Sequence, residues 1–181
     1  MSEYVQYYRN RPELFEKFKL VYRLEWTENM KRQRVEGDER MRQIISSDQE
    51  IPISRSQEYC SYIIHSIETG KPRRVNANIK NNWLITNLPE GCCVEVPCLV
   101  DKNGIHPCHI GDLPPQCAAL NRTNINVQEL GVLAAVERDK TVVFQAVLLD
   151  PLTSAMLTID ETRRMVDEMF EAEAEYLEGF K

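Results

Sequence analysis

Glycine is scarce in this chain, and its few glycines are widely spread. Seven of the 181 residues are glycine, at Gly37, Gly70, Gly91, Gly104, Gly111, Gly131 and Gly179. No two of them are close enough to form a G-x-G-x-x-G loop or a Walker loop, whose backbone N–H groups cradle the phosphates of a nucleotide. The sequence therefore predicts that these residues hold no nucleotide cofactor.

Several other signals are missing as well. The net charge is −6, so the chain lacks the basic face of a general nucleic-acid binder and the polybasic segment of a membrane-surface protein. Its apolar runs are far shorter than the ~20 residues that span a bilayer, and no signal-peptide core follows Met1. Six cysteines occur, but a chain of this length can build its own core. We therefore expect reduced thiols and a cytoplasmic location.

Residues 1–50 are rich in charge and are predicted to be helical. Apolar residues recur there at helical spacing, at Leu14, Phe18, Val21 and Tyr22. The stretch 31–42 is almost wholly polar, which indicates either a solvated helix or a mobile segment.

A short helix is predicted after the proline-containing connector at 51–54. Ser54 and Gln57 fit a capping box at its start, and Gly70 fits a left-handed cap at its end. Helical spacing then predicts a buried stripe, formed by Cys60, Ile63, Ile64 and Ile67.

The middle of the chain has β-compatible segments, separated by Asn, Pro and Gly. The predicted strands are 74–79, 83–87, 93–96, 99–100 and 105–110. Asn103-Gly104 favours a tight turn, because this pair readily adopts positive φ angles, so residues 95–110 are predicted to form a hairpin.

Helices are predicted again from Pro114 onwards. One runs to about Arg138, Asp139 caps the next, and Asp150-Pro151 ends it. Thr158 and Glu161 fit the capping box of a last helix, whose predicted buried residues are Met165, Val166, Met169, Phe170 and Leu177. The fold class is therefore predicted as α+β, a single domain over 1–181 with helices around a small, mostly antiparallel sheet.

Candidate site residues concentrate in the β-rich segment. His106, Cys108 and His109 resemble zinc ligands in type, but on a strand His109 opposes the other two, so a structural role is favoured. Carboxylates flank the predicted hairpin at Glu90, Glu95, Asp101 and Asp112, either lining a cleft or facing solvent. Amides cluster at Asn76, Asn78, Asn81, Asn82 and Asn87; they suit sugar hydroxyls but also suit turns.

Aromatic residues cluster at the N-terminus. Tyr4, Tyr7 and Tyr8 precede Arg9, a group that suits an active-site wall, a subunit interface or a frayed end.

Several strings in the sequence resemble the C-terminal region of glycoside hydrolase family 4. The most specific are Val-Glu-Val-Pro at 94–97 and Val-Asp-Lys-Asn-Gly-Ile-His-Pro at 100–107. The segments 126–135 and 150–153 look like the α-galactosidase/α-glucosidase branch, and Ser2-Glu3-Tyr4 is similar to a family segment shortly after the catalytic core. Two positions depart from the family: Lys80 stands where proline is common, and Trp83 where glycine is common.

The resemblance implies a lactate dehydrogenase-type C-terminal domain that covers the substrate and builds subunit contacts. Family members oxidise a sugar hydroxyl by hydride transfer to NAD, stabilise the enolate with a metal ion, usually manganese, and expel the aglycone by elimination. Their cofactor loop, metal ligands and main acid/base groups precede the matched part. No catalytic, cofactor-binding or metal-binding residue is therefore carried over, and Tyr4, Asn76 and Asn78 are the substrate-side candidates.

The resemblance favours one function and leaves two alternatives. The favoured one is the substrate-side and oligomerisation domain of an NAD- and manganese-dependent α-glycosidase, inactive without its N-terminal Rossmann domain, which this chain lacks. Its expected partners are that nucleotide-binding half, a sugar and further copies of the chain, with no nucleic acid or membrane. The alternatives are a non-catalytic interaction module and a small metal-binding protein using His106, Cys108 and Glu95.

Overall fold

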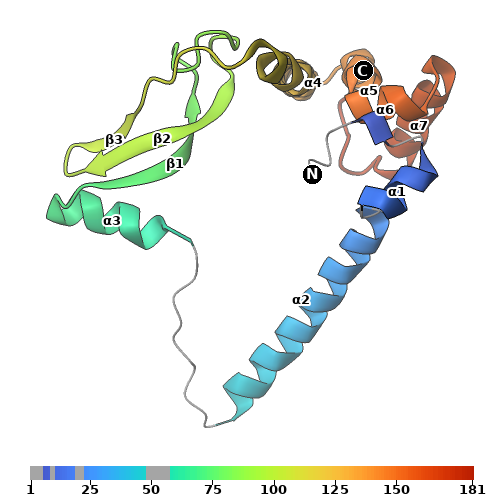
Figure 1. Ribbon diagram of the computed structural model, residues 1–181. Coiled ribbons are helices and arrows are strands. Elements are labelled where there is room, and N and C mark those ends of the chain that lie inside the picture. Colours follow the sequence, from blue (N-terminus) through green and yellow to red (C-terminus); the bar gives the residue numbers. More distant parts are fainter. Residues whose placement is uncertain (1–5, 9–10, 19–22, 48–57) are drawn as a thin grey trace. The chain divides into compact units, whose positions relative to one another are not determined.

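The computed structural model describes residues 6–8, 11–18, 23–47 and 58–181, which fall into two compact units (Figure 1). Unit 1 comprises Tyr8–Gln57 with Met1, and unit 2 comprises Ser2–Tyr7 with Glu58–Lys181. A single domain across the whole chain therefore stays a prediction. Tyr4, the 51–54 connector and the Ser54/Gln57 cap lie outside the described residues.

The N-terminal part is helical. A 3-10 turn, η1 (Gln6–Tyr8), precedes helices α1 (Pro12–Phe18) and α2 (Arg23–Ser46). The rings of Tyr8 and Phe18 lie 4.9 Å apart between centroids. Helix α2 has 24 residues and is about 36 Å long. The polar stretch 31–42 lies within α2 and is exposed, so the solvated helix is the alternative that the structure shows.

Unit 2 begins with helix α3 (Cys60–Thr69) and a three-stranded antiparallel sheet. The strands β1 (Arg73–Lys80), β2 (Cys93–Asp101) and β3 (Gly104–Pro107) lie in the order β1-β2-β3. Four helices follow: α4 (Pro115–Glu137), α5 (Lys140–Leu149), α6 (Pro151–Met156) and α7 (Ile159–Ala172). The predicted fold class, helices around a small antiparallel sheet, is confirmed.

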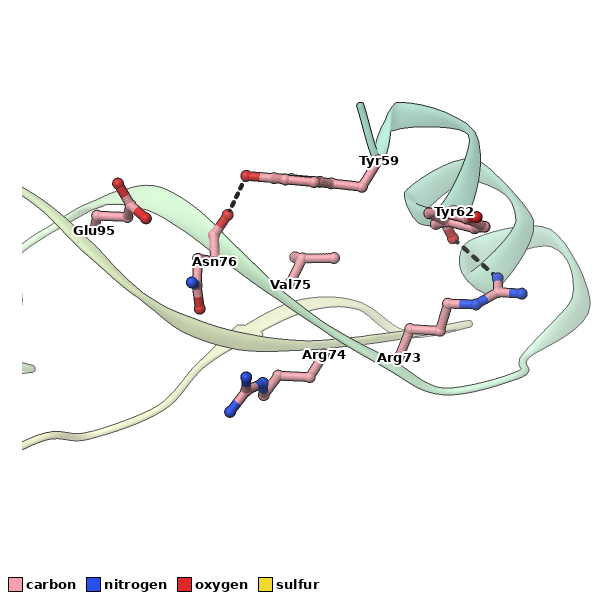
Figure 2. Close-up of a pocket in the computed structure, with 7 residues that line it drawn as sticks. All are labelled: Tyr59, Tyr62, Arg73, Arg74, Val75, Asn76 and Glu95. Carbon is pink, nitrogen blue, oxygen red and sulfur yellow. Dashed lines mark hydrogen bonds between the residues drawn. The ribbon is translucent and has the colours of Figure 1, made fainter. Parts of the chain in front are cut away.

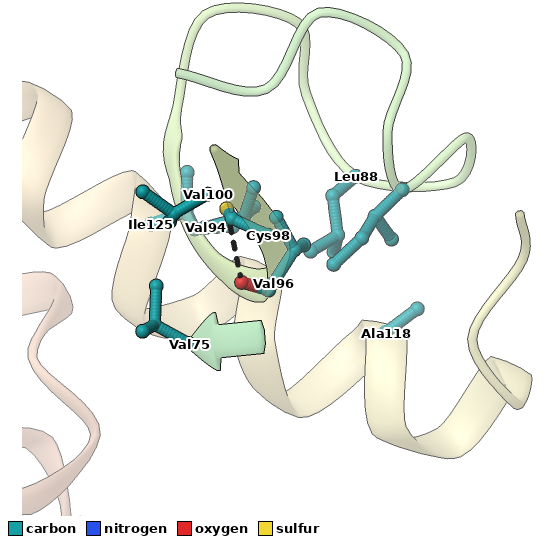
Figure 3. Close-up of a cluster of buried hydrophobic side chains, with 9 residues drawn as sticks. Val75, Leu88, Val94, Val96, Cys98, Val100, Ala118 and Ile125 are labelled. Atoms are coloured by element: carbon teal, nitrogen blue, oxygen red, sulfur yellow. Dashed lines mark hydrogen bonds between the residues drawn. The ribbon is translucent and has the colours of Figure 1, made fainter. Parts of the chain in front are cut away.

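The core lies on one face of β2. Along this strand Val94, Val96, Cys98 and Val100 are buried, while the residues between them are partly or fully exposed, because successive side chains of a strand point to opposite faces. Burial raises the pKa of the Cys98 thiol above its ordinary value. These side chains cluster with residues from β1, the following loop and α4 (Figure 3), namely Val75, Ile85, Leu88, Ala118 and Ile125.

The predicted buried stripe of α3 is wrong in most of its members. Cys60 is exposed, Ile64 is 56% exposed and Ile67 is 38% exposed, whereas Ser66 is fully buried. Ile63 alone of the four packs against the core. The helix is short and its two apolar rows are close together, so the position of the sheet decides which row is covered, and spacing along the sequence cannot.

The segment 83–87 was predicted as a strand and is a loop. Its single ladder contact is a bridge between Ile85 and Gly111. Leu84 O accepts from the N–H groups of Ile110 and Gly111 at 2.8 and 3.1 Å, so the backbone pairs with the chain that follows β3. For the same reason the predicted return strand 105–110 is shorter, and β3 ends at Pro107. The predicted strands 93–96 and 99–100 are one strand, β2.

One buried amide organises this loop. Asn81 is 0% exposed. Its Nδ2 donates to the carbonyl oxygens of Ile85, Leu88 and Pro89 at 3.0, 3.3 and 3.0 Å, and its Oδ1 accepts from Ile85 N–H at 3.0 Å. A short amide can satisfy several backbone groups that would otherwise be buried without partners. Asn81 is therefore a structural residue, as the turn interpretation of the amides predicted.

Trp83 has a left-handed backbone, with φ of 58°, and its side chain is 55% exposed. A Cβ atom crowds the backbone in this region, which is why glycine is the residue that adopts it readily. Trp83 therefore holds this left-handed conformation at a free-energy cost that would be smaller for glycine.

The predicted helix caps at Gly70, Asp139 and Thr158 are confirmed. Asp139 Oδ1 accepts from the N–H groups of Thr141 and Val142, and Thr158 forms a complete capping box with Glu161. Gly70 closes α3 with φ of 73°. Of the residues predicted to be buried in the last helix, Val166 is buried, but Met169 is 55% exposed.

Replacing the loop amide should destabilise unit 2. We expect Asn81→Ala to lower the free energy of unfolding by about 3 kcal/mol, because buried backbone groups lose their partners. Asn82→Ala, which removes an exposed amide next to it, should change it by less than about 0.5 kcal/mol. Urea titration followed by circular dichroism measures both, and equal effects would contradict the role of Asn81.

Trp83 allows a test of the backbone alone. Trp83→Gly and Trp83→Ala both remove the indole, but only alanine keeps a Cβ at positive φ. We expect the glycine variant to be more stable by about 1 kcal/mol. The same urea titration compares the two, and an alanine variant as stable as the glycine variant would show that the position carries no strain.

Candidate functional site

A pocket of about 330 Å³ lies between α3 and the sheet, within unit 2 (Figure 2). Such a volume is at the lower end of the range for small-molecule sites. Its lining combines aromatic, cationic, amide and carboxylate side chains from α3, β1 and β2, and the residues are Tyr59, Tyr62, Arg73, Arg74, Val75, Asn76 and Glu95.

One wall of the pocket is fixed by Tyr59, the residue just before α3. Its hydroxyl donates to the backbone carbonyl of Asn76 on β1 at 2.6 Å, which ties the start of the helix to the strand. Figure 2 shows the Tyr59 ring spanning the opening between α3 and β1. The Asn76 side chain is exposed and takes no part in this bond, and it points away from the Tyr59 ring in Figure 2, so its amide is open to solvent at the edge of the pocket.

Arg73 closes the opposite end of the pocket through several contacts. Its guanidinium lies 5.0 Å from the centre of the Tyr62 ring and donates to Tyr62 O at 3.4 Å. It also lies 2.9 Å from His65 Nδ1. Because arginine can only donate, His65 Nδ1 is the acceptor in this contact. The Arg73 head is thus held in place, which makes it a fixed positive charge in the pocket wall.

Asn78 lies beside the pocket and pairs directly with Glu95. The two residues face each other in the β1–β2 ladder, where Cβ atoms of opposed residues are about 5 Å apart. Both are exposed on the same face of the sheet as Asn76. The substrate-side candidates Asn76 and Asn78 are therefore brought together, and Glu95 joins them.

The other carboxylates have different surroundings. Asp101 accepts from Asn103 N–H at 2.7 Å in the hairpin turn; this bond, with a smaller contribution from His106, lowers the pKa of Asp101. Asp112 accepts from the Thr86 hydroxyl, and Glu90 is exposed. None of these three residues lines the pocket described above.

Two further amides differ in role. Asn87 bridges its loop to Leu113, donating to Leu113 O at 2.7 Å and accepting from Leu113 N–H at 2.9 Å. Asn82 is exposed. With Asn81 and Asn87 engaged by the backbone, the amide cluster divides into structural members and the Asn76/Asn78 pair on the sheet.

The His/Cys cluster does not converge on Glu95. His106 Nε2 lies 3.4 Å from Asp101 Oδ1, and His106 pairs with Leu99 of β2. Glu95 is four residues earlier on that strand, about 13 Å away along it. Within residues 6–8, 11–18, 23–47 and 58–181, no three His, Cys, Asp or Glu side chains gather as a metal site would require.

Sequence reasoning missed most of the pocket. It identified Asn76 and considered Glu95, but gave no site role to Tyr59, Tyr62, Arg73 or Arg74. One signal was present, because Tyr59 and Tyr62 are three residues apart and hence on one side of a helical turn. Their meeting with Arg73 depends on how α3 folds back onto β1, which the sequence pattern does not specify.

These features define the class of protein: an α+β domain with a polar pocket beside its sheet. The family profile described as the family 4 glycosyl hydrolase C-terminal domain matches residues 1–153. The chain belongs to this family. It is 42% identical to an α-galactosidase of Bacillus subtilis (strain 168) over 182 aligned residues, which cover 99% of this chain.

Solved structures agree on the fold. A 6-phospho-β-glucosidase of Thermotoga maritima superposes with a TM-score of 0.71 at 23% identity, covering 94% of this chain and 40% of that one. A 6-phospho-α-glucosidase from gut microorganisms, solved with NAD and Mn²⁺, has a TM-score of 0.71 at 22% identity, covering 92% of this chain and 38% of that one.

The matched segment is a minor part of these relatives. The chain spans 42% of the length of the B. subtilis α-galactosidase.

Among the described residues, no helix is both long and apolar enough to cross a membrane.

Proposed function

We propose that this chain is the substrate-side domain of an NAD- and manganese-dependent α-glycosidase that hydrolyses α-galactosides and works as a homo-oligomer. The observation that carries the proposal is the 42% identity with an α-galactosidase along nearly the whole chain. The 6-phospho-α-glucosidase that shares the fold was solved with NAD and Mn²⁺, which supports the choice of cofactors.

The cofactors would be held by another part of the enzyme. The widely spread glycines leave no loop that could cradle a pyrophosphate. The described His, Cys, Asp and Glu side chains do not fit a metal ion, because no three of them converge. NAD would supply the hydride acceptor when bound, and these residues would position the sugar. The chain alone is therefore expected to be inactive.

The pocket between α3 and the sheet is the proposed sugar-facing surface. Asn76 and Asn78 offer amide donors and acceptors, and Glu95 offers two acceptor oxygens to hydroxyl groups. The Tyr59 ring provides an apolar face of the kind that packs against the C–H face of a sugar ring. The candidate Tyr4 stays a prediction that only its family string supports.

Reconstitution tests the proposed activity. The chain would be mixed with the segment of the B. subtilis α-galactosidase that precedes the matched part, and assayed with 4-nitrophenyl α-D-galactopyranoside. We expect nitrophenol release only when both polypeptides, NAD and Mn²⁺ are present, since the cofactor sites lie in the added half. Omitting each component in turn provides the controls.

Two results would contradict this proposal. One is turnover by the chain alone, which would place the whole active site in these residues. The other is absence of turnover although the two polypeptides co-elute as a folded complex, which would favour the non-catalytic interaction module.

The pocket carboxylate should matter for binding rather than for chemistry. In the reconstituted enzyme we expect Glu95→Ala to raise KM about tenfold with kcat little changed, because it removes a charged hydrogen bond to the sugar in ground and transition states alike. Glu90→Ala removes an exposed carboxylate outside the pocket and should leave KM unchanged. Steady-state kinetics measure both, and equal KM values for the two variants would exclude the pocket as the sugar-facing surface.

A further inference from the structure

Helix α2 carries a row of large apolar side chains that unit 1 itself leaves exposed. Trp26 is 55% exposed, Met30 is 47% exposed, Met41 is 49% exposed and Ile45 is 72% exposed. These residues follow one another at intervals of four, eleven and four positions. Eleven residues make three turns of an α-helix, so all four lie on one side of it. We call this row the α2 stripe.

The rest of α2 is unusually polar. Eleven of its 24 residues are Asp, Glu, Lys or Arg. A helix surrounded by water gains no stability from a tryptophan, two methionines and an isoleucine on one side. Exposed apolar rows with polar borders mark surfaces that bind other proteins. The α2 stripe therefore calls for a covering partner.

The spacing of the stripe residues is the same when read from either end. Positions 26 and 45, 30 and 41, and 34 and 37 are each symmetric about the point between Val35 and Glu36. We propose that α2 pairs with α2 of a second copy of this chain, antiparallel and about a twofold axis at that point. Trp26 then faces the partner's Ile45, and Met30 faces the partner's Met41. A twofold interface requires such self-complementarity, because the same patch serves both copies.

Gly37 fits the centre of this arrangement. In the twofold pairing it lies opposite the partner's Arg34, close to the axis where two helices approach. A Cβ placed on Gly37 meets no atom within 4 Å, so the backbone there is open and can accept the long arginine side chain.

Charges beside the stripe also match. Lys31, Arg34 and Asp38 lie along one flank of α2, at the i, i+3 and i+7 spacing of a single helix face. In an antiparallel twofold pair this flank meets the same flank of the partner. Asp38 then comes within about 3 Å, along the helix axis, of the level of the partner's Lys31 and Arg34. Opposite charges therefore meet at two places in each dimer. A parallel pairing in the same register would not bring these opposite charges to the same level.

This inference rests on the proposed homo-oligomer and names its surface. It does not rest on the proposed chemistry, since self-association is measured without NAD, manganese or sugar. The experiments can therefore distinguish a failure of the α2 pairing from a failure of the proposed glycosidase activity.

Light scattering of the purified full-length chain, across a range of concentrations, tests the pairing. The wild type should dimerise. Met41→Glu should leave a monomer at concentrations where the wild type is dimeric, because it places a charge opposite the partner's Met30. Circular dichroism of the same samples checks that the helical content is kept.

Charge reversal tests the antiparallel register. Asp38→Lys should weaken the dimer about tenfold, since two attractive contacts become repulsive. Lys31→Asp/Arg34→Asp/Asp38→Lys should restore the affinity by exchanging the two signs. Glu39→Lys makes the same change one residue further on, on the opposite side of α2, and should have no effect. The loss caused by Asp38→Lys should shrink in high salt.

Any of the following outcomes would overturn the inference. A wild-type chain that is monomeric throughout would show that no second copy covers the stripe. A dimer insensitive to Met41→Glu would place the interface elsewhere. Equal effects of Asp38→Lys and Glu39→Lys, or no recovery in the triple variant, would exclude the antiparallel register. If Met41→Glu instead blocks binding of the nucleotide-binding half, the stripe faces that polypeptide.

Discussion

The fold of unit 2 depends on the alternation of buried and exposed side chains along β2. Every second side chain of this strand enters the core, and the side chains between them form the open face of the sheet. Moving the strand by one residue would bury Glu95 and expose Val96, so the hydrophobic core and the polar pocket fix each other's position. The register with β1 then sets Asn78 opposite Glu95 and leaves Asn76 on the same face.

The asparagines of β1 and those of the loop after it have different surroundings. Asn76 and Asn78 lie on the pleated surface and keep their amides free of the backbone ladder, whereas Asn81, just beyond the strand, turns inward and binds four backbone groups. The difference comes from position in the pleat and from the end of the strand. The same amide group therefore stabilises the loop at Asn81, whereas on the sheet it stays exposed at Asn76 and Asn78.

Local signals in the sequence predicted the ends of the elements well. Asp139, the Thr158/Glu161 pair and Gly70 all act within a few residues of themselves, so their roles follow from the residues alone. The errors concern contacts between distant segments. Which side of α3 is covered depends on the sheet, and the chain at 83–87 pairs with residues some 25 positions later. The pocket lining follows the same division: Asn76 was among the predicted residues, whereas Tyr59, Tyr62 and Arg73 were not.

Cys98 has a consequence beyond packing. Its thiol is enclosed by the core on the inner face of β2, and its raised pKa keeps it protonated, so it is a poor nucleophile in the folded chain. Cys60, Cys93, Cys108 and Cys117 are all exposed. Of these five cysteines, alkylating reagents therefore reach four at any time and reach Cys98 only when the sheet opens. The rate at which Cys98 is alkylated therefore measures the rate at which the core opens.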